Sequence, residues 1–139
     1  MNKHHPTPEA LVNAFFSRVW SPPHDISAID ELMTKDYEIT TAGTLIQGRD
    51  NFKEWVRRFQ EVLIDATNES LEIFTNQEDT RVVSRWVCSG INHGLLGLPA
   101  DQQFISFTGI AIWAVRDGRL SACWVERSAW ELYQSLRAQ

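Results

Sequence analysis

The chain has 139 residues, of which 43% are hydrophobic and 22% charged, and its formal net charge is −5. This length and composition indicate a single globular domain over residues 1–139. The acidic balance argues against a nucleic-acid surface, which needs a basic stripe, and against binding to anionic membranes. No apolar run approaches the ~20 residues of a spanning helix. The first residues contain no apolar signal core, so we expect a cytoplasmic protein.

The first half of the chain is predicted to be mostly helical. Thr7 as N-cap and Pro8 at the first helical position begin a helix that the proline pair at 22–23 ends, near residue 20. A second, short apolar stripe follows over residues 26–33, then a brief strand over 37–41 and another short extended piece between two glycines at 43 and 48. A third helix with a clean buried face is expected over 50–63, with Asp50 as its cap.

The second half changes to strand patterns. Four strands are predicted: Leu71 to Thr75, Arg81 to Asn92, Phe104 to Arg116 and Arg119 to Arg127. Asp117-Gly118 is typical of a tight hairpin turn, and a helix over about 129–136 ends the chain. Helices followed by a meander of strands indicate an α+β fold. A curved antiparallel sheet wrapped around the helices would leave a conical cavity.

Aromatic residues occur on both faces of the predicted strands: Trp86, Trp113, Trp124, Phe104 and Phe107. One face covers the helices, and the other would be exposed in a monomer. Wide apolar exposure is unusual in monomers, so we expect a homodimer through the sheet. The alternative is that some of these aromatics line the cone.

Several segments resemble a known family when taken in order: Val82-Val-Ser-Arg-Trp86, Gly90-Ile-Asn-His-Gly-Leu-Leu-Gly-Leu-Pro99 and Cys123-Trp-Val-Glu-Arg-Ser128. Together they resemble the SnoaL-like polyketide cyclases, a branch of the nuclear-transport-factor-2-like superfamily. The resemblance covers nearly the whole chain. It implies a cone-shaped α+β barrel in which a carboxylate removes a proton next to a carbonyl of a hydrophobic compound, without a cofactor.

The chain departs from the family at the positions that usually carry chemistry. Asn92 stands where the resemblance implies a His, Ser128 where it implies the acid/base Asp, and Thr40 where it implies another His. His93 is displaced by one position. A one-residue shift on a regular strand turns a side chain to the opposite face, although a bulge beside a glycine can return it.

Alternation along the last strand selects the first candidate base. If the family Asp points inward from the position of Ser128, then Trp124 and Glu126 share that inward face. Glu126 is then the best carboxylate for acid/base catalysis. The alternative is that Glu126 lies in water or pairs with Arg85 or Arg127. His93 is the second candidate acid/base, against the alternative of a solvated loop histidine.

Other polar residues are candidates for substrate binding. Tyr37, Arg85 and Asn92 are hypothesised to support a ligand carbonyl or an enolate oxygen, with Trp124 and Ser128 as further contacts. Arg85 is equally well explained by a pair with Glu126.

No cofactor or metal is expected, since the sequence lacks zinc-ligand spacing and a Gly-rich phosphate loop. The absence of a Gly-x-Ser-x-Gly elbow argues against a serine hydrolase. The two cysteines, Cys88 and Cys123, are expected to be buried and reduced.

Two classes of function remain open, with a hydrophobic small molecule as the expected partner in each. The first is a cofactor-independent cyclase or isomerase that transfers a proton on a hydrophobic carbonyl compound, with epoxide hydrolysis as a variant. The second is a ligand-binding or assembly module that keeps the cone without catalysis. The position of two side chains separates them: Glu126 in solvent and His93 outside the cavity would favour binding.

Overall fold

The structure is a computed structural model that describes residues 5–138. Its helices are α1 (Pro8–Arg18), α2 (Ile29–Leu32), α3 (Arg49–Val62) and α4 (Ala129–Arg137), with 3₁₀ turns at Ile26–Ala28 and Leu95–Gly97. Its strands are β1 (Met33–Thr41), β2 (Thr44–Gln47), β3 (Leu63–Thr75), β4 (Arg81–Asn92), β5 (Phe104–Arg116) and β6 (Arg119–Arg127).

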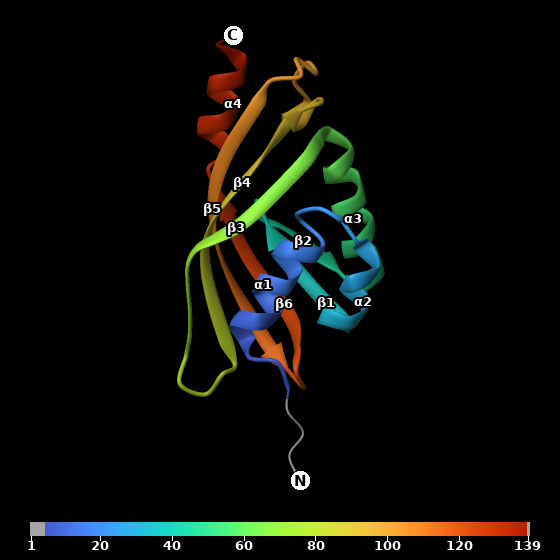
Figure 1. The fold of residues 1–139 in the computed structure, drawn as a ribbon, viewed down its shortest axis with the longest axis vertical. Coiled ribbons are helices and arrows are strands. Elements are labelled where there is room, and N and C mark those ends of the chain that lie inside the picture. The colour runs from blue at the N-terminus through green and yellow to red at the C-terminus, as the bar shows by residue number, and fades with distance from the viewer. Residues whose placement is uncertain (1–4, 139) are drawn as a thin grey trace.

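The six strands form one mixed sheet in the order β2-β1-β6-β5-β4-β3. Every neighbouring pair is antiparallel except β1 and β6, which run parallel. The sheet is strongly bent, and α1 and α3 pack against its concave face (Figure 1). The predicted curved α+β cone is therefore confirmed. None of the helices in residues 5–138 is both long enough and apolar enough to cross a membrane.

The first helix follows from its local sequence. The Thr7 hydroxyl accepts a hydrogen bond from the Ala10 amide at 3.1 Å, as an N-cap should. The apolar stripe that starts at Leu11 and Val12 and includes Phe15 and Phe16 is buried. This stripe places the two phenylalanines under the sheet, where they help to line the cavity described below.

Most predicted element boundaries are confirmed, and three are wrong: β1 begins at Met33 rather than Tyr37, and the other two concern β3 and α3. The strands β4, β5 and β6 have the predicted ends, but β3 begins at Leu63 rather than Leu71. Register shifts between Ile64 and Thr67 and between Ser70 and Glu72 break the alternation that would have revealed the longer strand. Gly48, not Asp50, is the N-cap of α3.

A bulge in β6 decides which of its side chains face the core. Ala122 pairs with Ala114 and Leu120 with Val115, which leaves Ser121 without a partner on β5. The extra residue reverses the alternation after Leu120. Cys123 and Val125 are consequently buried, while Trp124 keeps 44% of its surface exposed.

The aromatics do occupy both faces of the sheet. Trp86, Phe107 and Trp113 are buried on the concave face, whereas Phe104 (70% exposed) and Trp124 lie on the outer face. Cys88 and Cys123 are buried free thiols, as predicted.

Candidate functional site: an aromatic cavity under the sheet

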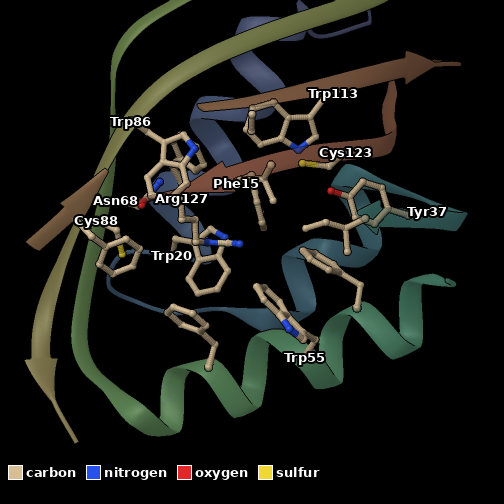
Figure 2. A pocket seen from close by; sticks show the side chains of 17 residues that line it. Phe15, Trp20, Tyr37, Trp55, Asn68, Trp86, Cys88, Trp113, Cys123 and Arg127 are labelled. Atoms are coloured by element: carbon tan, nitrogen blue, oxygen red, sulfur yellow. The ribbon is translucent and has the colours of Figure 1, made fainter. Parts of the chain in front are cut away.

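A narrow cavity lies between α1, α3 and the concave face of the sheet (Figure 2). Aromatic side chains make up most of its wall, and its free volume is about 40 Å³. That volume holds on the order of three water molecules. Pockets that enclose a drug-sized ligand measure roughly 300–1,000 Å³, so the cavity in this conformation is too small for such a ligand. Only Trp55, Phe59 and Arg127 among the lining residues are half-buried rather than buried, and we call their end the mouth.

Three polar groups meet at the deep end: the Tyr37 hydroxyl, the Trp113 indole and the Cys123 thiol (Figure 2). Tyr37 Oη lies next to Trp113 Nε1 and the Cys123 thiol, but neither Tyr37 Oη nor Trp113 Nε1 forms a hydrogen bond of normal distance and angle with a described residue. A buried polar group without a partner costs about 1–3 kcal/mol. The deep end therefore offers two donors that an oxygen atom of a ligand would satisfy.

Arg127 supplies the positive charge at the mouth. Its guanidinium lies 5.3 Å from the centre of the Trp55 ring and 5.9 Å from that of Trp86, in cation–π geometry. Its Nη1 donates a hydrogen bond to the Thr41 hydroxyl. No carboxylate within residues 5–138 forms an ion pair with it. Among the described residues this cation therefore has no ion-pair partner, and the charge of Glu126 acts on it only from beyond ion-pair distance.

Gly109 makes room for this arrangement. It lies on β5 between Trp86 of β4 and Arg127 of β6 in the strand register. A Cβ atom at this position would come within 2.2 Å of the Trp86 indole. The indole can therefore lie across β5 toward the guanidinium only because residue 109 has no side chain.

The titratable groups of the cavity wall are one cation and three groups held neutral. Burial raises the pKa of Tyr37 well above its ordinary value of 10.0. Burial also raises the pKa of Cys88 and that of Cys123 to about 12 each. Burial lowers the pKa of Arg127. No lining residue is an Asp, Glu or His, so the wall contains no base for neutral pH.

The orientation predicted for the last strand is wrong. Glu126 is exposed on the outer face and Trp124 lies beside it, with Arg81 stacked 5.8 Å from its ring centre. The prediction took Ser128 as the inward residue, but β6 ends at Arg127 and Ser128 is the N-cap of α4. Beyond the bulge at Ser121 the odd-numbered residues of β6 face the core. Ser128 lies at the start of α4, outside the cavity wall, where its hydroxyl accepts a hydrogen bond from the Thr108 amide at 3.0 Å.

Asn92 is also outside the cavity wall. It is fully buried, and its Nδ2 donates to Pro99 O at 3.2 Å and to Asp101 Oδ1 at 2.8 Å. Its Oδ1 accepts from the amides of Gly94 and Leu95 at 3.2 and 2.9 Å. These four bonds use the whole capacity of an amide side chain. Asn92 therefore holds the loop after β4 and has no donor left for a ligand.

His93 and Arg85 do not reach the cavity either. His93 is exposed, and its Nδ1 bonds Gln102 Nε2 at 2.8 Å. Arg85 is exposed and pairs with Glu72 at 3.0 Å, not with Glu126. Its neighbour Trp86 points inward, so alternation sends Arg85 to the outer face.

Of the predicted site residues, Tyr37 alone lines the cavity. The sequence interpretation missed Arg127, Trp113 and Gly109 as parts of the site. The sequence pattern predicts for Arg127 only an ion pair with Glu126, because regular alternation assigns Arg127 to the outer face. The sequence contains one weak signal for Arg127. Cys123, Val125 and Arg127 share one face by alternation, and the apolar Cys123 and Val125 fit an inward face. Within residues 5–138 no cluster of three or more His, Cys, Asp or Glu side chains is placed to hold a metal ion.

The family model of the SnoaL-like domain matches residues 12–123. The chain belongs to the SnoaL-like domain family. This agrees with the resemblance seen in the sequence motifs and with the cone-shaped sheet. A comparison with curated protein sequences gave no match.

Solved structures share the whole fold at low sequence identity. A candidate SnoaL-like polyketide cyclase from Jannaschia sp. CCS1 has a TM-score of 0.85 and 14% identity, over 100% of this chain and 99% of that one. A candidate polyketide cyclase from Xanthomonas campestris pv. campestris has a TM-score of 0.82 and 23% identity, over 93% and 96%. A phenazine biosynthesis-related protein from Pseudomonas aeruginosa has 0.77 and 12%, over 95% and 82%. At these identities the likeness shows the fold alone.

Proposed function

We propose that this SnoaL-like protein binds a flat, apolar small molecule in the cavity under the sheet. The observation that carries the proposal is the pair of buried donors, Tyr37 Oη and Trp113 Nε1, which face a largely aromatic cavity and form no hydrogen bond with a described residue. Sites for small molecules combine an apolar wall with a few convergent polar groups. A carbonyl or similar oxygen of the ligand would accept from both donors.

The closed cavity requires a movement on binding. A flat ring system exceeds a free volume of about 40 Å³. Trp55 and Phe59 on α3 are half-buried at the mouth, whereas every lining residue on the sheet except Arg127 is buried. Displacement of these two side chains is the shortest route to a larger cavity, because it leaves the strands in place.

Binding is better supported than proton transfer. Both candidate bases, Glu126 and His93, are exposed and do not line the cavity. Epoxide hydrolysis would also need a base to activate water, and the wall offers none.

The second candidate function is a cyclase or isomerase acting on a polyketide-like carbonyl compound. Family membership favours it, and so do Arg127, Tyr37 and Trp113, which together would stabilise an enolate oxygen. In that case the base would have to come from outside the cavity wall, as an ionised group of the substrate or a water molecule. Turnover that survives both Glu126→Gln and His93→Ala would support this route.

The test of binding is a titration of the protein with 2-naphthamide, a flat neutral compound with one carbonyl, followed by the indole N–H signals in ¹H–¹⁵N NMR spectra. The chain has six tryptophans. We expect the signals of Trp55, Trp86 and Trp113 to shift, while those of the exposed Trp124 and Trp130 stay in place. Trp113→Phe should weaken binding about 2- to 10-fold, the value of a neutral hydrogen bond.

Two results would contradict the proposal. The first is the absence of any shift at Trp113 up to millimolar 2-naphthamide or 2-naphthoate. The second is a shift confined to Trp124 and Trp130, which would place the compound on the outer face of the sheet.

A further inference from the structure

Arg127 is the one charged side chain in the cavity wall, and the proposed binding of a neutral carbonyl does not use it. It belongs to β6 and lies beyond the segment that the family model matches. Figure 2 shows its guanidinium among the indoles at one end of the cavity, and Trp113, Tyr37 and Cys123 together at the other.

The surroundings of Arg127 satisfy only part of its bonding capacity. A guanidinium has five N–H donors in a planar fork. The described residues supply one hydrogen-bond acceptor, the Thr41 hydroxyl, and two ring faces, those of Trp55 and Trp86. The nearest carboxylate in sequence, Glu126, points to the outer face of the sheet. Burial of a charge without a counter-ion is costly, and a protein usually relieves it with an anion.

The geometry points to a carboxylate on the ligand. We infer that the cavity binds a flat aromatic or polyene carboxylate, whose carboxylate pairs with Arg127 while a second oxygen at its other end accepts from Tyr37 and Trp113. This inference rests on the proposed binding function and names the chemical class of the ligand. A planar carboxylate matches the fork of a guanidinium in a bidentate pair. The rings of Trp55 and Trp86 already hold the guanidinium plane at the mouth.

A purely structural role for Arg127 makes a different prediction. In that role the guanidinium ties β6 to β1 through Thr41 and fills space between two indoles, so it stabilises the fold and is indifferent to the charge of a ligand. The two roles therefore differ in one measurable quantity, the preference for a carboxylate over an amide of the same shape.

The experiment compares 2-naphthoate with 2-naphthamide at pH 7 by calorimetry, on the wild type and on three variants. In the wild type we expect 2-naphthoate to bind roughly 10- to 100-fold more tightly, as for a hydrogen bond to a charged group. Arg127→Gln should abolish the preference, and Arg127→Lys should keep part of it, because an ammonium is a point charge without the fork. Arg85→Gln is the matched control, since Arg85 is an exposed arginine on the outer face.

The outcomes separate the two proposals. If neither compound binds at the cavity, the proposed function fails. If 2-naphthamide binds with an affinity equal to that of 2-naphthoate in the wild type, binding stands and the carboxylate inference is overturned. The inference is also overturned if Arg127→Gln weakens both compounds by the same factor. If Arg127→Gln does not fold, equal affinities in the wild type still overturn the inference, and Arg127→Lys, which lacks the planar fork, provides the variant comparison.

Discussion

Replacement of Gly109 by alanine tests whether the position of Trp86 depends on the missing side chain. The new Cβ atom would lie 2.2, 2.6 and 2.7 Å from three atoms of the indole. Carbon atoms in ordinary contact are about 3.5–4.0 Å apart, so the indole would have to withdraw by more than ~1 Å. Phe16 and Phe107 pack against the same ring, with centroid distances of 6.5 and 6.0 Å.

The expected cost follows from this crowding. Overpacking of a well-packed core costs about 1–3 kcal/mol. Alanine also lowers the conformational entropy of the unfolded chain relative to glycine, and this raises the free energy of unfolding by about 0.4–1 kcal/mol. For a rigid aromatic neighbour we expect Gly109→Ala to lower the free energy of unfolding by about 2 kcal/mol. In a domain of this size that corresponds to a fall in Tm of roughly 5–10 °C.

A double-mutant cycle with Trp86→Leu isolates the contact. Leucine does not extend over residue 109 as the indole does, so in that background Gly109→Ala should be neutral or slightly stabilising. Urea unfolding of the four proteins gives the coupling free energy, expected at about 2 kcal/mol. The argument is refuted if Gly109→Ala is within about 0.5 kcal/mol of the wild type, or costs the same in both backgrounds.

Three further predictions concern the loop, the thiols and the outer face. Asn92→Asp removes two donors and sets a carboxylate against Asp101, so it should lower the free energy of unfolding by about 2–4 kcal/mol. The control His93→Ala, at an exposed residue, should change the free energy of unfolding by less than about 0.5 kcal/mol. Equal effects of the two substitutions in urea unfolding would contradict this prediction. Burial raises the pKa of the Cys88 and Cys123 thiols from 9.0 to about 12, so the unfolded chain loses these protons at a lower pH than the folded protein. The free energy of unfolding should therefore fall as pH rises from 9.0 toward about 12, by up to about 1.4 kcal/mol per pH unit for each thiol. Cys88→Ala should roughly halve that slope between pH 9 and 10, and an unchanged slope in denaturation curves would count against the pKa argument. We propose that two copies of the chain pair through the outer face of the sheet. Ile112→Glu on that face should then convert the dimer to a monomer in sedimentation velocity. A wild type that is monomeric at micromolar concentration would exclude the dimer.

The candidate site shows where prediction from the sequence stopped. Tyr37, predicted as a contact for a ligand carbonyl, does line the cavity. Alternation counted back from Ser128 assigns Arg127 to the outer face, but Ser128 is the N-cap of α4 and not an inward strand residue. Asn92 is predicted to contact a ligand because of its position in a motif. In the structure its amide forms four hydrogen bonds within the protein, which leaves none for a ligand.

The sequence by itself determined the elements whose signals are local. Thr7 and Pro8 define the start of α1, and Asp117-Gly118 takes the positive φ angles of a tight turn between β5 and β6. Such signals need only neighbouring residues, and the helices-then-strands order is enough for the α+β class. Only the tertiary structure decided which face of each strand meets the cavity. A bulge costs little locally, yet it turns every later side chain of a strand to the opposite face, and its place is set by pairing with residues far away in the sequence. For this reason Arg127 points inward and Glu126 faces solvent.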